Sequence, residues 1–224
     1  MKKFLALACL MATAMYGAVI PIGTPGAILA VGPHTGATYT AATCVYPPTG
    51  AILSTYTVLP QSCSPAQTVT FSLLGAHRDV PGTWATWAAP PFTESATPNI
   101  SFFDDVTSLT LTLSTGASVF GFEIEPDSFG TPPGYYFDVE FKDGLGGSLG
   151  TVTVPILGSS GARLFAGYTS DGTYSIKSAV ITAPAGASGF AIAQIRSDVP
   201  EPATYAIVGA GLLALAGFAR RRKV

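Results

Sequence analysis

Polar and apolar residues alternate in several segments through the middle of the chain. Residues 68–73 and 108–114 alternate strictly, and residues 119–124 and 136–141 continue the pattern. A period of two is typical of a β-strand with one buried face. Gly- and Pro-containing turns separate such segments at roughly the spacing of a β-sandwich or barrel. The pattern predicts an all-β body with about nine or ten strands from residue 37 onward.

The hydropathy pattern differs at the start of the chain. Lys2 and Lys3 precede an apolar run over 4–11, and small residues follow at Ala12 and Ala14. This order predicts a secretory signal peptide over 1–18. Cleavage after Ala14 fits the A-x-A preference better than cleavage after Ala18. The alternative is a short N-terminal anchor, although the run is shorter than the roughly 20 residues that span a bilayer.

A second apolar run covers residues 203–219 and carries no charge. As a helix it would measure about 25 Å, which is at the short end of what crosses a bilayer. Four cations follow it at 220–223, and such clusters stay on the cytoplasmic side. We therefore predict one transmembrane helix, with the preceding body outside the cytoplasm.

Two prolines flank an acid immediately before this run, and they keep it extended and outside the helix. Together, the proline-flanked acid, the Ala/Gly/Leu-rich run and the basic end resemble the PEP-CTERM protein-sorting tail. Such tails are sometimes given an ice-binding name, but the tail itself has no means of binding ice. The resemblance implies an exported substrate of an exosortase, a membrane-embedded cysteine peptidase or transpeptidase of Gram-negative bacteria that make exopolysaccharide. The residues that match the recognition motif and the basic stop are Pro200, Glu201, Pro202, Arg220, Arg221 and Arg222.

The stretch from Asn99 to Arg196 more loosely resembles the lectin-like jelly rolls that often precede such tails. The resemblance rests on Gly121-Phe122-Glu123 and on Gly189-Phe190-Ala191-Ile192. Many of those domains carry an Asp-Asn pair after the final strand, where this chain has Ala193-Gln194. We expect a single β-sandwich ectodomain over 37–197, after a Gly/Pro-rich lead-in over 19–36 and before the sorting tail over 198–224.

The amino-acid composition supports the all-β class and disfavours one class of binding partner. Glycine and proline supply 43 of 224 residues, while only 11% of residues are charged, which favours a turn-rich β protein over a helical one. Six of the 11 cations lie in the two ends, so the body holds five cations against 13 acids, a formal charge of 5 − 13 = −8. Phosphate binding needs clustered cations, and nucleic acid is therefore disfavoured as a partner.

Cys44 and Cys63 are the two cysteines that remain after removal of the signal peptide. An even pair in an exported protein predicts a disulfide. It would stabilise the front of the body by roughly 3 kcal/mol through the chain entropy of the loop it closes. Two free buried thiols are the alternative.

Motifs for catalysis are absent from the sequence. His34 and His77 have no evident triad partners, and no G-x-S-x-G, H-E-x-x-H or phosphate-loop sequence occurs. Paired acids could serve a glycoside hydrolase, but the preferred interpretation is that they are solvent-facing alternates to buried residues. Loop aspartates could hold calcium, although without EF-hand spacing. The acids concerned are Glu123, Glu125, Asp138 and Glu140 for the pairs, and Asp104, Asp105 and Asp127 for calcium.

Trp84 and Trp87 lie in a proline-rich loop over 78–98. Together with Tyr135 and Tyr136 they suggest sugar binding, because pyranose rings stack on exposed aromatic faces. The alternative is that the tryptophans cover the end of the sandwich.

Taken together, the sequence predicts a non-enzymatic exported protein, anchored in the inner membrane and then placed at the cell surface or in the matrix with exopolysaccharide or biofilm. An exosortase is the expected partner, and no cofactor is expected, calcium being the one candidate. The alternatives are a carbohydrate-binding module that uses Trp84 and Trp87, and a secreted hydrolase that uses paired carboxylates.

Overall fold

The computed structural model describes residues 18–22, 43–44, 52–59, 67–89, 92–93, 95–128, 135–156, 161–173 and 175–197. The predicted signal peptide up to residue 17, the sorting tail from residue 198 and Cys63 lie outside these ranges. The predicted disulfide from Cys44 to Cys63 therefore stays a prediction.

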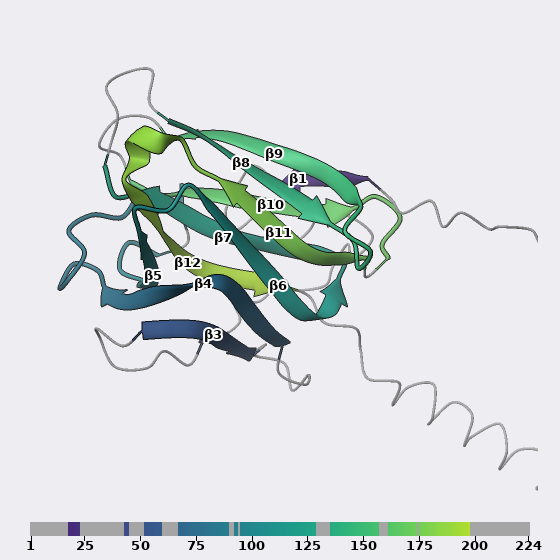
Figure 1. The fold of residues 1–224 in the computed structure, drawn as a ribbon, viewed down its shortest axis with the longest axis horizontal. Coiled ribbons are helices and arrows are strands. Elements are labelled where there is room, and N and C mark those ends of the chain that lie inside the picture. Colours follow the sequence, from purple (N-terminus) through teal and green to yellow (C-terminus); the bar gives the residue numbers. More distant parts are fainter. Residues whose placement is uncertain are drawn as a thin grey trace, which may run out of the picture.

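Most of the described residues lie in β-strands, which confirms the predicted all-β class (Figure 1). Within them the helical structure is one 3-10 turn at Ala185–Ala187. None of the described residues forms a helix long and apolar enough to cross a membrane. The strands are β1 (Val19–Ile22), β2 (Thr43–Cys44), β3 (Ile52–Leu59), β4 (Gln67–Asp79), β5 (Asn99–Asp104), β6 (Ser108–Ala117), β7 (Val119–Pro126), β8 (Tyr135–Lys142), β9 (Ser148–Ile156), β10 (Arg163–Thr169), β11 (Ile176–Thr182) and β12 (Gly189–Ser197).

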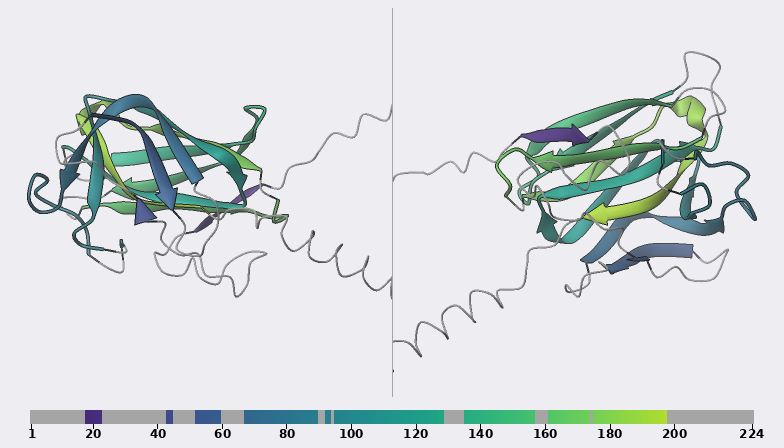
Figure 2. Two further views of the ribbon diagram at one scale, coloured as in Figure 1. Left: turned by 90° about the horizontal axis from the view of Figure 1, so that it is seen from below. Right: turned by 180° about the vertical axis from the view of Figure 1, so that it is seen from behind.

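All the strands join one continuous antiparallel sheet in the order β1-β10-β7-β12-β5-β4-β6-β11-β8-β9, with β3 and β2 added beyond β4. The sheet curls until its two edge strands, β1 and β9, approach each other (Figure 2). A β-carbon placed on Gly150 of β9 would stand 3.5 Å from the Val19 carbonyl oxygen of β1. The structure is therefore a nearly closed, barrel-like sheet, where the sequence predicted a sandwich of separate sheets.

Strand β1 was not predicted, because Val19–Ile22 falls at the start of the expected Gly/Pro-rich lead-in. Its residues pair with β10 from Val19↔Thr169 to Ile22↔Ala166. Ile22 is buried against the outer face of the sheet with Val119 and Leu164. The strand thus completes one edge of the curled sheet.

The main core fills the inside of the curled sheet and is rich in phenylalanine. Phe137 of β8 lies edge-on to Phe165 of β10 and Phe190 of β12, with ring centroids 6.3 Å and 5.7 Å apart. These contacts join strands from opposite halves of the sheet. Among the largest fully buried side chains, those of this core are Phe103, Phe120, Phe122, Phe137, Phe141, Phe165, Phe190, Leu109, Leu111 and Leu113.

The curled sheet has two ends. At one, which we call the exit end, β1 begins and β12 finishes: the Ser170 amide donates to the Ala18 carbonyl oxygen at 3.0 Å, and Ser197 pairs with Phe120 near the start of β7. The β8–β9 turn at 143–147 lies at this end, toward the right of Figure 1. The opposite end, which we call the far end, holds the start of β8 and the 3-10 turn, joined by a hydrogen bond from the Tyr135 hydroxyl to the Gly186 carbonyl oxygen at 2.6 Å.

Candidate functional site

Strand β7 is buried on both faces, in contrast to the one-sided burial that its alternation predicts. Phe120, Phe122 and Ile124 point into the main core. Glu123 and Glu125 occupy the opposite, outer face, and both are completely buried. The interpretation of these two acids as solvent-facing alternates was therefore wrong.

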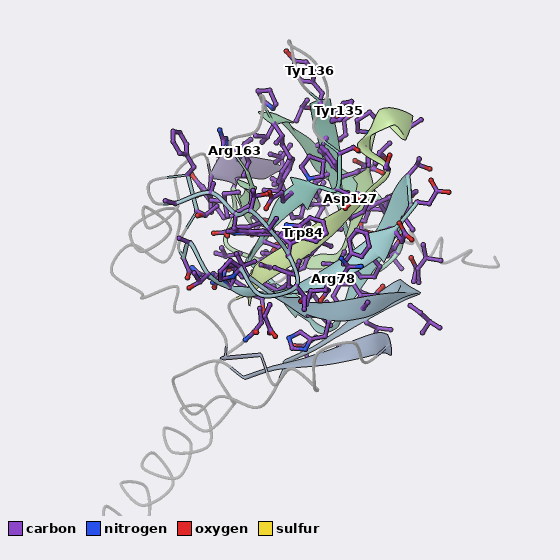
Figure 3. All side chains as sticks on the ribbon, turned by 90° about the vertical axis from the view of Figure 1, so that its left-hand side faces the viewer. Arg78, Trp84, Asp127, Tyr135, Tyr136 and Arg163 are labelled. Carbon is purple, nitrogen blue, oxygen red and sulfur yellow. The ribbon has the colours of Figure 1, made fainter. Side chains whose placement is uncertain are left out.

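Small residues on the neighbouring strand make room above the two acids. Glu123 pairs with Ala193 of β12, and Glu125 pairs with Ala191. Methyl groups at these positions leave space over the outer face, and the loop between β4 and β5 fills it. Figure 3 shows Trp84 of this loop in the view from the far end.

The loop is fixed to the acids by three side-chain hydrogen bonds. The Trp87 indole nitrogen donates to Glu123 Oε2 at 3.0 Å. The Trp84 indole nitrogen donates to Glu125 Oε2 at 3.2 Å, and Thr86 Oγ1 lies 2.5 Å from Glu125 Oε1. We call these five residues the Glu–Trp cluster: it joins one strand to one loop through hydrogen bonds to two buried carboxyl groups.

Burial has a large effect on the protonation of the two acids. Desolvation raises the pKa of Glu123 to about 8, against the smaller opposing effect of the hydrogen bond from Trp87. Desolvation likewise raises the pKa of Glu125 to about 7, opposed by the hydrogen bonds with Thr86 and Trp84. Burial therefore favours the neutral, protonated form of both carboxyl groups, and more strongly for Glu123 than for Glu125.

Apolar residues and an arginine surround the Glu–Trp cluster. The Trp84 and Phe102 rings lie with centroids 5.0 Å apart, and the Arg78 guanidinium stands over Phe102 at 4.3 Å. The loop also approaches the start of β10 closely: Gly161 has φ 79°, and a β-carbon there would stand 2.4 Å from the Ala88 nitrogen. The buried residues of this group are Val80, Trp84, Trp87, Ile100, Phe102, Ala162, Ala191 and Ala193.

Two separate hypotheses from the sequence thus meet in one place. The tryptophan pair and the first acid pair were considered independently, and the structure joins them by hydrogen bonds. Sugar stacking needs exposed rings, but Trp84 and Trp87 are only 7% and 9% exposed. They act as a cover, and they cover the outer face of the sheet instead of its end. Thr86 was missed, although its place between the tryptophans was the available signal.

The other acids that the sequence singled out lie apart from this cluster. Asp138 and Glu140 point outward from β8, as the alternation predicts, and Glu140 forms an ion pair with Lys142 at 3.0 Å. A hydrogen bond from Lys142 lowers the pKa of Glu140. The calcium candidates Asp104, Asp105 and Asp127 are exposed. Among the described residues no three potential metal ligands gather in one group.

The remaining candidates fall into two groups. His77 is buried on β4, with its Nε2 atom 3.5 Å from Asp79 Oδ1, and His34 lies outside the described residues. Tyr135 and Tyr136 lie at the far end, where Tyr136 is 55% exposed (Figure 3). Neither tyrosine is part of the Glu–Trp cluster.

Comparisons with known proteins identify a motif in the tail and assign no function to the body. No curated protein matches the chain. Among solved structures, the chain is similar to the enzymatically active domain of tailspike protein 4 of bacteriophage CBA120, at 14% identity and a TM-score of 0.29. That match covers 58% of this chain and 17% of the tailspike chain. A scan against protein families matches residues 198–223 to the PEP-CTERM protein-sorting motif. This protein therefore carries a PEP-CTERM sorting motif, as its proline-flanked acid, apolar run and basic end indicated.

Proposed function

We propose that this protein is exported, sorted by an exosortase, and placed at the cell surface or in the extracellular matrix as a non-enzymatic partner of exopolysaccharide. The observation that carries the proposal is the PEP-CTERM motif at residues 198–223. The motif implies an exported, membrane-anchored substrate that an exosortase processes. Association with exopolysaccharide is the part of the proposal that goes furthest beyond the motif.

The Glu–Trp cluster supports a structural role for the body's most unusual acids. Both carboxyl groups are completely buried, and donors from a single loop engage them. A glycoside hydrolase instead needs two acids that flank a bound sugar across an open cleft. The cluster is thus better suited to holding the loop on the sheet than to catalysis.

The experiment for sorting compares the native host with a strain that lacks its exosortase. We expect the mature protein to lose its tail in the first strain and to keep it in the second, as measured by intact mass. Glu201→Ala should also block processing, because it removes the acid between the two prolines. Asp138→Ala, a change of an exposed acid in the body, is the matched control and should be processed normally. An intact tail in the native host would refute the proposal.

A second candidate function is a carbohydrate-active site, because two acids of raised pKa beside two indoles are residue types that glycosidases use. The site would have to form by lifting of the loop. The test is turnover of the host's own exopolysaccharide by the purified body. A hydrolase would lose turnover in both Glu123→Gln and Glu125→Gln, whereas the structural role predicts no turnover in any form.

A further inference from the structure

Both segments that lead toward the membrane leave the body at its exit end. Strand β1 begins next to the predicted signal peptide, and β12 ends next to the sorting tail. The two strands run in opposite directions with β10 and β7 between them. The register places Val19 beside Thr169 and Ser197 beside Phe120, which belong to the same end of the β10–β7 pair.

The tether between the body and the predicted span is short. Five residues, 198–202, separate Ser197 from the start of the apolar run at Ala203. A chain extends by at most about 3.6 Å per residue, so Ser197 stays within roughly 20 Å of the span. By comparison, a nine-residue strand such as β12 is about 30 Å long. The tether therefore holds the exit end near the membrane and is too short for the far end to replace it.

The surface of the exit end carries an exposed leucine on a turn that a side chain holds by hydrogen bonds. Asp143 Oδ1 accepts hydrogen bonds from the amides of Leu145 and Gly147 at 2.8 Å and 2.7 Å, which fixes the β8–β9 turn. Asp143 is only 8% exposed, so its carboxyl group faces the backbone of the turn and not the solvent. Leu145 at the tip is 87% exposed, the largest fraction among the exposed large hydrophobic residues that the structure describes.

An apolar side chain at the tip of a fixed turn suits the boundary between lipid headgroups and acyl chains. Amphipathic surfaces bind there by burying apolar side chains while polar groups remain in water. At the opposite end of the body, Tyr136 is the large exposed side chain of β8. The two ends thus offer a direct contrast between one position close to the tether and one remote from it.

We propose that, before its tail is processed, the protein stands on the membrane by its exit end, with Leu145 in the lipid headgroup layer and the far end, with Tyr136, held away from it. This proposal rests on the sorting function proposed above. The partner is the lipid surface itself and not the exosortase, so the contact forms in membranes that contain lipid alone.

The test uses the full chain, produced in a host without exosortase and reconstituted in vesicles of phosphatidylethanolamine and phosphatidylglycerol. A photoreactive benzoylphenylalanine replaces Leu145, Tyr136 or Leu74 in turn. Leu74 is a matched control because it is apolar and 65% exposed but lies on β4, along the side of the body. After irradiation, mass spectrometry measures the lipid adducts at each position.

We expect several-fold more lipid adduct at position 145 than at position 136 or 74. Equal labelling at 145 and 136, or labelling that is strongest at 74, would overturn the orientation, the latter because the body would then lie on its side. Flotation of the vesicles separates this failure from failure of the sorting function. A chain that does not float with vesicles contradicts both proposals, whereas a floating chain with no adduct at 145 contradicts the orientation alone.

Discussion

The two faces of β7 are equally buried, but different kinds of interaction stabilise them. On the inner face, Phe120, Phe122 and Ile124 pack among other apolar side chains. On the outer face, Glu123 and Glu125 lie under a loop and bind it through indole and hydroxyl groups. Burial alone therefore does not tell how a face contributes to stability.

The difference between the faces is one of pH dependence and of specificity. Packing of phenylalanine is insensitive to pH and depends on volume, because a core tolerates apolar residues of similar size. A buried carboxyl instead costs free energy when it ionises, and it accepts only a partner with a donor in the right place. The inner face thus sets most of the stability, and the outer face determines how one particular loop sits.

The largest effect is expected from the inner face. Phe122→Ala removes a fully buried ring from the middle of β7, and such truncations cost about 3–5 kcal/mol in the free energy of unfolding. Denaturant titration followed by circular dichroism measures it. Tyr136→Ala, which removes an exposed ring, should change stability by less than about 1 kcal/mol; an equal loss in both variants would contradict the assignment of the core.

A smaller effect of opposite sign is expected from the outer face. The pKa of Glu123 rises from 4.5 to about 8 on folding, so the folded chain keeps a proton that the unfolded chain releases. This makes the stability contribution of Glu123 highest below pH 4.5 and lower as the pH rises toward 8. Glu123→Gln keeps an acceptor for Trp87 and removes the titration, so the variant should be more stable than the wild type by about 3 kcal/mol at pH 7.

The measurement for this prediction is the free energy of unfolding of both forms between pH 4 and pH 9. Their difference should grow over the range from 4.5 to 8 and then level off. Glu140→Gln is the control, because Glu140 is partly exposed and the hydrogen bond with Lys142 lowers its pKa. A wild-type curve parallel to that of Glu123→Gln would show that Glu123 does not carry the effect.

The smallest effect is expected from a single donor of the loop. Trp87→Phe keeps an aromatic ring but leaves Glu123 without the indole N–H, which should cost about 1–3 kcal/mol. The loss should grow above about pH 8, where the Glu123 carboxyl ionises and the missing indole donor would have stabilised its charge. Trp84 then remains as the one tryptophan of the chain, and a red shift of its fluorescence before the loss of circular dichroism would report lifting of the loop alone. Coincident transitions would mean that loop and sheet unfold together.

The alternation of polar and apolar residues predicted the strands well where each strand has one solvent-exposed face. The predicted segments 68–73 and 136–141 fall inside β4 and β8, and β8 has buried apolar residues between exposed or half-buried ones. Strand β1 was missed because four residues with a proline carry no periodic signal. Its partner strand is far along the chain, so only the pairing with β10 defines it. Closure of the sheet depends on the same long-range pairing.

The Glu–Trp cluster could be predicted only in its parts. An alternating pattern tells which residues share a face of a strand. It does not tell what covers that face, so the sequence predicted that Glu123 and Glu125 face solvent. A loop covers these two acids, and the sequence of that loop does not tell which residues its tryptophans contact. The available clue was the pairing of two alanines, Ala191 and Ala193, with the two acids, and that requires the strand order. The tail, by contrast, was readable because its three parts follow one another in sequence.

The position of the last strand has a consequence for the timing of folding. Strand β12 is not at an edge: it lies between β7 and β5 in the middle of the sheet. Strand β1 pairs Val19 with Thr169, residues that are 169 − 19 = 150 positions apart. Contacts over such separations form late and slowly. The pairing of the sheet is therefore complete only once residue 197 is available, and the sorting motif at residues 198–223 follows that residue directly.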